Sequence, residues 1–134
     1  MAYRATELLK GIIARLKAIS AVTDIVGQRI YSSVPDNPTF PYLTVGILAS
    51  ENKTKDRSKY RYDIAIQSYS RKDSQKETHD VHAAIDSALD RQEHTISLDA
   101  GEMVLLEHIS TIGLVRDPDG VTWLQVSNYI SHVE

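Results

Sequence analysis

The chain has 134 residues, of which 42% are hydrophobic and 25% are charged, and its formal net charge is −3. This length gives room for one packed core, so we predict a single domain over residues 1–134. The slightly acidic balance argues against a protein whose whole surface binds nucleic acid. Because the sequence contains no cysteine, disulfides, thiolate zinc sites and a cysteine nucleophile are excluded.

Neither a membrane-spanning segment nor a signal peptide is visible in the sequence. No stretch reaches the roughly 18 consecutive apolar residues that a membrane-spanning helix needs. The N-terminal residues lack a basic segment followed by an apolar run and a cleavage site. We therefore expect no contact with a membrane and synthesis in a cytoplasm.

The first predicted element is an amphipathic helix that begins at Thr6. Its apolar residues recur at spacings of three and four and form one stripe, namely Leu8, Leu9, Ile12, Ile13, Leu16 and Ile19. Glycine costs a helix about 1 kcal/mol relative to alanine, so Gly11 indicates close backbone packing. A short second helical turn over residues 22–26 is expected to end at Gly27, because glycine suits the left-handed backbone that follows a helix.

Three strands follow the helices. Residues 29–34 form the first predicted strand, and the loop after it is stiff because it contains three prolines, Pro35, Pro38 and Pro41. Residues 42–50 and 60–70 are the next two strands. In the third strand Tyr60, Tyr62, Ile64 and Ile66 alternate with Arg61, Asp63 and Gln67. Such alternation predicts a sheet with one buried face.

A second amphipathic helix and a β-hairpin complete the chain. Ser74 and Glu77 form a capping box, and the helix after them runs to about Gln92 with an apolar stripe of Val81, Ala84, Ile85, Ala88 and Leu89. Residues 102–115 and 121–133 are rich in β-branched side chains and flank a turn, Asp117-Pro118-Asp119-Gly120. Proline and glycine stand where a type I turn prefers them, which predicts a hairpin.

The predicted element order is α-β-β-β-α-β-β. It indicates an α+β fold with a mostly antiparallel sheet packed against two main helices. Long strands in so small a chain leave sheet edges and one sheet face uncovered, which favours self-association.

Three residues match a loose pattern of Mg²⁺-dependent nucleases, in which an aspartate and a glutamate bind the metal beside a lysine. These residues are Asp36, Glu51 and Lys53. A strand over residues 42–50, rising about 3.3 Å per residue, is expected to hold the two carboxylates at its opposite ends. A turn aspartate and a charged loop therefore explain them better, and a nuclease is kept as an alternative function.

Two further patterns partly match known metal sites. His79 and His82 lie three residues apart, with Asp86 one turn further on, but the sequence supplies no further ligand in that pattern. A calcium loop that begins at Asp117 needs glycine at its sixth position and glutamate at its twelfth, but this chain has Thr122 and Asn128 there. We therefore expect no metal and no cofactor.

The segment 51–62 carries the one concentrated charge of the sequence. It contains five basic residues, Lys53, Lys55, Arg57, Lys59 and Arg61, against two acidic ones, Glu51 and Asp56. Three interpretations stay open: a solvated hairpin tip, a contact with a partner protein, and a contact with a DNA backbone. A DNA-binding accessory protein is thus a second alternative function.

Several short segments carry a family resemblance. Arg29-Ile30-Tyr31 and Val34-Pro35 precede Phe40-Pro41-Tyr42-Leu43-Thr44-Val45-Gly46, and later come Asp63-Ile64, Ser70-Arg71 and Arg116-Asp117-Pro118-Asp119-Gly120 followed by Thr122. In order and spacing these segments resemble the tail completion, or tail-to-head joining, proteins of long-tailed double-stranded DNA bacteriophages. The resemblance covers essentially the whole chain.

The resemblance implies a structural virion protein with a tail-terminator-like fold, no catalytic machinery and no cofactor. Such a protein caps the head-proximal end of the tail tube as a ring of six copies. Its implied partners are other copies of itself, the tail tube protein and the head completion, or stopper, protein, and DNA only passes through the ring. Its implied location is the head–tail joint of the virion, after synthesis in the cytoplasm of the host bacterium.

The resemblance transfers no interface residues, so we propose two loops from their own chemistry. The first is a candidate protein-contact loop with Lys53, Lys55, Arg57 and Lys59, because exposed charges orient a partner. The second is a candidate docking loop with Pro35, Phe40 and Pro41, which prolines hold in shape at low entropic cost. An alternative place for Phe40 is the core.

Overall fold

The computed structural model describes residues 3–55, 58–71, 75–116 and 119–134. Its helices are α1 (Ala5–Ala18), α2 (Ser20–Val26), α3 (Lys76–Leu89) and the short 3₁₀ helix η1 (Glu93–Thr95). Its strands are β1 (Ile30–Tyr31), β2 (Tyr42–Asn52), β3 (Tyr60–Ser70), β4 (Met103–Arg116) and β5 (Trp123–Val133). This order confirms the predicted α+β fold. None of the described helices is long and apolar enough to cross a membrane.

The strands form one sheet in the order β1-β2-β3-β5-β4. Only the two-residue strand β1 pairs in parallel, with β2, and all other pairs are antiparallel. The predicted hairpin is confirmed, because β4 and β5 pair directly. At one end of the sheet a single row of paired residues crosses four strands: Asn52, Tyr60, Val133 and Met103.

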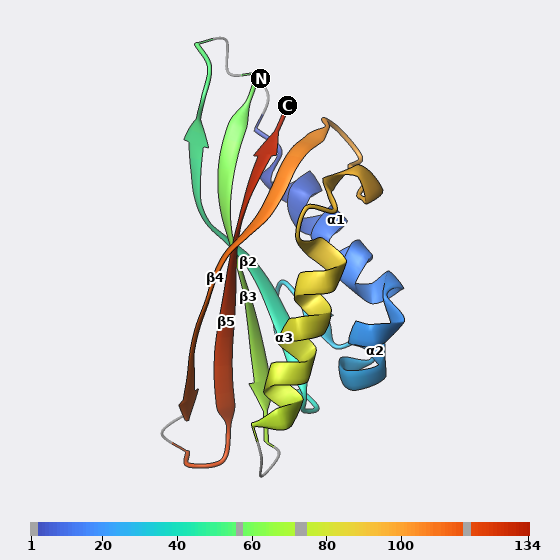
Figure 1. The fold of residues 1–134 in the computed structure, drawn as a ribbon, viewed down its shortest axis with the longest axis vertical. Helices are drawn as coiled ribbons and strands as arrows, with labels where there is room; N and C mark the ends of the chain where they lie inside the picture. Colours follow the sequence, from blue (N-terminus) through green and yellow to red (C-terminus); the bar gives the residue numbers. More distant parts are fainter. Residues whose placement is uncertain (1–2, 56–57, 72–74, 117–118) are drawn as a thin grey trace.

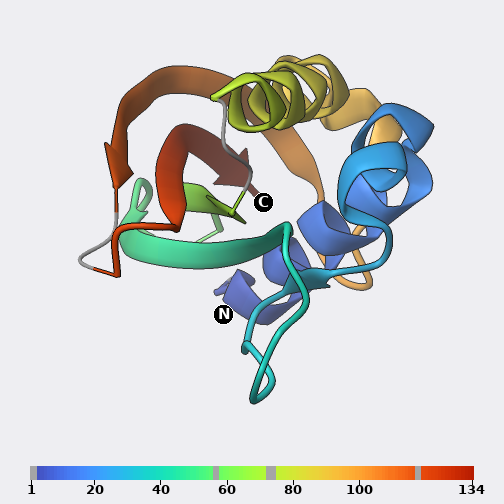
Figure 2. The same ribbon diagram turned by 90° about the horizontal axis from the view of Figure 1, so that it is seen from below.

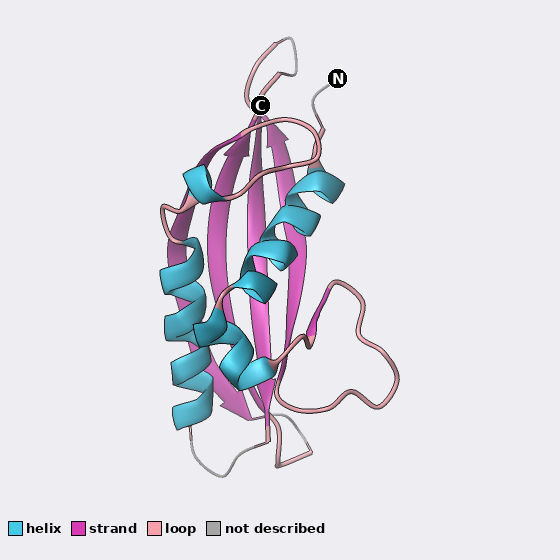
Figure 3. Ribbon diagram, turned by 90° about the vertical axis from the view of Figure 1, so that its right-hand side faces the viewer, coloured by secondary structure: helices cyan, strands magenta, loops and turns pink. Residues whose placement is uncertain are grey.

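The helices cover one face of the sheet and leave the other face open (Figures 1 and 3). Tyr62 and Ile64 of β3 and Tyr129 of β5 are almost fully buried beneath the helices. The helices contribute the rest of this layer, including Leu8, Ile12 and Leu16 of α1 and Val81, Ile85 and Leu89 of α3. The alternation of β3 thus predicted the buried face correctly.

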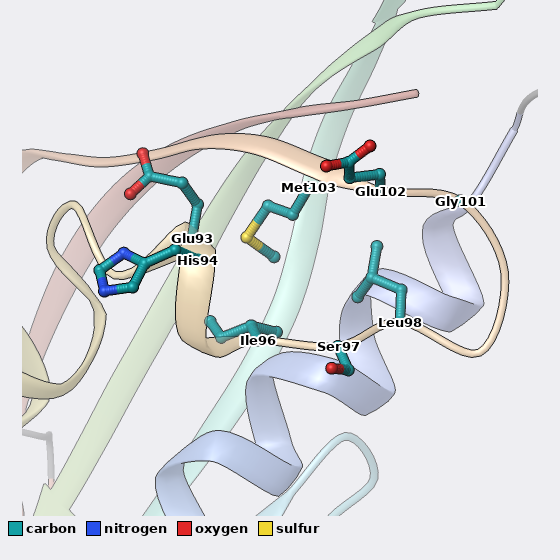
Figure 4. A pocket seen from close by; sticks show the side chains of 8 residues that line it. All are labelled: Glu93, His94, Ile96, Ser97, Leu98, Gly101, Glu102 and Met103. Carbon is teal, nitrogen blue, oxygen red and sulfur yellow. The ribbon is translucent and has the colours of Figure 1, made fainter.

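Close packing of α1 depends on Gly11, as its position in the helix predicted. A Cβ atom at this position would lie 2.7 Å from Leu98 Cδ2 and 3.2 Å from Ile96 Cγ2. The segment between η1 and β4 therefore lies directly against the α1 backbone (Figure 4). Gly27 ends α2 with a φ of 61°, which also agrees with the prediction.

Two predicted elements differ most from the structure in their boundaries. The strand expected over residues 29–34 is only Ile30–Tyr31, because the chain then leaves the sheet in a projecting loop (Figure 3). The second main helix ends at Leu89 rather than near Gln92. It ends there because Asp90 is extended and the Arg91 N–H donates to the Leu106 carbonyl, which directs the chain towards β4.

Three residues of the predicted turn signals lie outside the described residues. They are Ser74 of the capping box and Asp117 and Pro118 of the hairpin turn. Glu77, the other member of the capping box, accepts a hydrogen bond of 2.7 Å from the Ser70 hydroxyl.

A buried histidine lies between α3 and the sheet. His82 is only 6% exposed, and its Nδ1 and Nε2 atoms lie 2.6 Å from Ser127 Oγ and 2.8 Å from Ser68 Oγ. Ser127 Oγ in turn lies 3.2 Å from Thr111 Oγ1 of β4. This hydrogen-bonded chain ties α3 to three strands and satisfies a polar ring that burial would otherwise penalise.

We predict that Ile85→Ala lowers the free energy of unfolding by about 2–5 kcal/mol, because it leaves a cavity between α3 and the sheet. Ile85 has no exposed surface. Denaturant titration measures the change, and Ser87→Ala, at an exposed position of the same helix, is expected to cost less than about 0.5 kcal/mol. Equal effects of the two substitutions would contradict the described packing.

The buried histidine also predicts a pH dependence. Burial, with smaller contributions from the charges of His79 and His108, lowers the pKa of His82 from 6.5 to about 4. The unfolded chain therefore binds this proton more readily than the folded chain, so stability is lost as the pH falls from about 6.5 towards 4. The loss attributable to this group is about 3 kcal/mol. We expect the unfolding free energy of the wild type minus that of His82→Asn to be about 3 kcal/mol lower at pH 4 than at pH 7. A pH-independent difference would refute the assignment.

Candidate functional site

The candidate protein-contact loop is the tip of the β2–β3 hairpin, and we call it the basic arm: Lys53, Lys55 and Lys59. Arg57, the fourth predicted residue, lies outside the described residues. The Lys53 N–H donates to the Lys59 carbonyl at 2.9 Å, which closes the base of the arm. The Thr54 hydroxyl accepts hydrogen bonds from the Ser58 and Lys59 N–H groups at 3.0 and 3.2 Å. The arm therefore has an ordered base.

The charges of the basic arm are only partly compensated within the chain. Lys53 Nζ lies 3.4 Å from Glu51 Oε1, and Lys59 Nζ lies 4.0 Å from Glu134 Oε1. Among the described residues, no ion pair is formed by Lys55. Burial lowers the pKa of His132, and the charges of Lys59, Arg61 and Lys53 lower it further. The arm thus produces a local positive potential.

The candidate docking loop connects β1 and β2 and projects away from the body of the molecule (Figures 2 and 3). Pro35 is exposed, and the neighbouring Val34 exposes 40% of its surface. Phe40 is half-buried. The centroid of its ring lies 5.1 Å from the ring centroid of Tyr42 and 4.0 Å from the guanidinium carbon of Arg71. Phe40 therefore anchors the end of the loop, and the exposed apolar surface belongs to Val34 and Pro35.

Arg71 connects this loop to the turn before β5. Its Nε donates to the Thr122 hydroxyl at 3.1 Å, and its guanidinium lies 3.5 Å from Asp119 Oδ2. Hydrogen bonds from the Thr122 hydroxyl and from the Val121 and Thr122 N–H groups lower the pKa of Asp119 to about 2. Asp119 is therefore ionised at neutral pH, and its role is to hold this turn.

The three residues of the nuclease pattern do not form a site. Asp36 lies in the loop before β2, whereas Glu51 lies near the far end of that strand. At about 3.3 Å per residue, the part of β2 from Tyr42 to Glu51 spans about 30 Å. Glu51 pairs with Lys53 instead. The predicted separation of the carboxylates is thus confirmed.

The two helical histidines have different environments. His82 is buried between two serine hydroxyls, whereas His79 is exposed. Within the ranges that the structure describes, no group of three or more metal-ligating side chains comes together.

A pocket of about 310 Å³ lies between η1 and the start of β4 (Figure 4). Glu93, on its wall, accepts hydrogen bonds from Arg91 Nε at 3.1 Å and from the Leu106 N–H at 3.3 Å. Burial acts to raise the pKa of Glu93, but these hydrogen bonds and one from its own N–H hold it below the ordinary value. This carboxylate is therefore engaged in holding η1 against β4.

The open face of the sheet has a groove of about 340 Å³ that the sequence did not reveal. Leu48 and Ile109 flank it and expose 68% and 52% of their surfaces, and Arg61 and Asp63 pair at 3.2 Å in its lining. Pairing is irregular at both apolar residues, between Ile47 and Ala49 and between His108 and Ser110. Such bulges interrupt the alternation from which exposed faces are predicted.

The family model described as "Tail completion protein gp17" matches residues 10–132. Among solved structures, one chain of a "Virion of native gene transfer agent (GTA) particle" is 19% identical, with a TM-score of 0.86, and the match covers 100% of this chain and 99% of that chain. At this identity the likeness shows the fold. Comparison with curated protein sequences gives no match.

The family match extends from the middle of α1 almost to the end of β5 and so includes both candidate loops and nearly the whole sheet. It agrees with the resemblance found in the sequence. The chain belongs to the family of tail completion protein gp17, a family of structural phage tail proteins.

Proposed function

We propose that this protein caps the head-proximal end of a phage tail tube as a ring of six copies and joins the tail to the head. Membership of the tail completion family is the observation that carries the proposal. The fold supports it, because a helix-covered sheet with an open face and open edges suits assembly with neighbouring subunits.

The proposed partners are other copies of the chain, the tail tube protein and the head completion protein. The likeness in fold to a chain of a gene transfer agent virion fits a place within a particle of this kind. We place the protein at the head–tail joint, after synthesis in the host cytoplasm. DNA is proposed to pass through the ring without sequence-specific contacts.

A structural role also fits the arrangement of the titratable groups. Asp36 and Glu51 lie at opposite ends of β2, and Glu51 and Lys53 pair with each other. His82 is enclosed by serine hydroxyls. A nuclease would need its carboxylates on one metal ion, so we propose a function without turnover.

We predict that a phage unable to make this protein produces filled heads and separate tails. The reason is that the proposed ring supplies the surface on which the head docks. Electron microscopy of lysates measures the fraction of joined particles, and expression of the wild-type chain in trans is the control that restores joining. Intact infectious particles without the protein would contradict the proposed function.

If such particles are intact, incubation of the purified protein with DNA and Mg²⁺ tests the alternative activity. DNA cleavage that Glu51→Ala and Lys53→Ala both abolish would establish the nuclease. DNA binding that weakens with added salt would establish the accessory role.

The projecting loop gives a second prediction. Val34→Asp places a charge on its exposed apolar surface and is expected to leave the melting temperature unchanged while reducing the yield of joined particles. The matched control is Ala83→Asp, at an exposed position of α3, which is expected to join heads normally. Normal joining with Val34→Asp would remove the loop from the docking surface, and a lower melting temperature would show that Val34 has a structural role.

A further inference from the structure

We propose that two copies of this chain dock head to tail, with the β4 edge of one copy against the β2 edge and basic arm of the next. This inference rests on the proposed ring and assigns its contact between subunits. It rests on four features of the two sheet edges: backbone that is partly free, a shared level along the strands, complementary charges and exposed apolar residues.

Each border of the sheet has some backbone that is free to pair, although β4 is partly covered. β1 pairs with β2 at Leu43 and Thr44, so residues 45–52 of β2 form an edge. Within the described residues, no strand pairs with the outer edge of β4. Residues 90–93 cover part of this edge, because the Leu106 N–H donates to Glu93, the Leu106 carbonyl accepts from the Arg91 N–H, and the His108 N–H donates to Asp90. β2 is antiparallel to β3, β3 is antiparallel to β5, and β5 is antiparallel to β4. β2 and β4 therefore run in opposite directions. A junction between them is therefore antiparallel, like the main pairs within the sheet.

The basic arm and the start of β4 lie at the same level of the sheet. The row from Asn52 through Tyr60 and Val133 to Met103 crosses the sheet from one edge to the other. The arm follows Asn52, and Glu102 precedes Met103. In a ring whose rotation axis runs along the strands, every copy keeps these residues at the same height. The arm of one copy therefore lies beside Glu102 of the next.

The charges at this level are complementary. Among the described residues, neither Lys55 nor Glu102 nor Glu107 has an ion pair. Glu102 is exposed, and its carboxylate points away from the apolar side chains of Ile96 and Leu98 (Figure 4). Within one copy, β3 and β5 separate the β2 edge from Glu102. A second copy of the chain supplies the opposite charge directly, which favours this register over others.

The same borders carry the exposed apolar side chains of the open face. Leu48 lies on β2, and Ile109 and Ile112 lie on β4 with 52% and 58% of their surfaces exposed. Joining the two edges brings Leu48 of one copy towards the β4 residues of the other and removes apolar surface from water. Such a contact is heterologous, and it generates a ring when the rotation closes.

Charge reversal and charge exchange test this contact in phage particles. Lys53→Glu with Lys55→Glu is expected to reduce joined particles about tenfold, because like charges then face each other. Glu102→Lys with Glu107→Lys is expected to do the same. The chain with all four changes restores the attraction and is expected to recover joining. The matched control, Lys10→Glu with Lys17→Glu on α1, has the same net charge as the first variant and is expected to join normally.

Cysteine cross-linking gives an independent readout, because the natural chain has no cysteine. Lys53→Cys combined with Glu102→Cys is expected to give covalent multimers in oxidised tails, whereas each single variant stays monomeric on a denaturing gel. Circular dichroism of each purified variant shows that it is folded.

The outcomes separate the inference from the function on which it rests. Normal joining by both charge-reversed variants, together with an absence of cross-linked multimers, would overturn the contact while the role at the joint stands. Failure of the four-fold variant to recover would also count against it. Normal joining in the complete absence of the protein would instead overturn the function.

Discussion

The structure depends on the burial of one face of a five-stranded sheet beneath the helices. Tyr62, Ile64 and Tyr129 form this layer against α1 and α3, and His82 is accommodated in it only because two serine hydroxyls satisfy its ring. The described residues include no further helix with which to cover the other face. The exposed apolar residues of that face follow directly from this limit on what the chain can bury.

The fold could be predicted largely from sequence periodicity. The limits of β3, Tyr60–Ser70, follow from its alternation, because a buried residue recurs at every second position from Tyr60 to Ser70. Gly11 was correctly assigned to a close contact. β1 was predicted too long, because strand propensity does not show that the chain leaves the sheet after Tyr31. The end of α3 depends on a hydrogen bond between Arg91 and Leu106, which only the folded chain reveals.

The candidate site was less predictable, for a different physical reason. The local charge of the basic arm is visible in the sequence, but its position relative to Glu102 depends on strand pairing across four strands. Likewise, the groove beside Leu48 and Ile109 depends on two bulges. Sequence reasoning also left Phe40 open between docking and core, and the structure places it as an anchor beside Tyr42 and Arg71. A surface for assembly is formed by residues that lie far apart in the sequence, and short motifs do not show which of them come together.

The central claim is that this chain forms the ring between tail tube and head. A cryo-electron microscopy reconstruction of the head–tail joint, from particles assembled with this chain, tests it most directly. The account predicts six copies in a closed ring at the head-proximal end of the tube, with β4 of each copy beside β2 of the next. Density for this chain elsewhere in the particle, or none at the joint, would contradict the account.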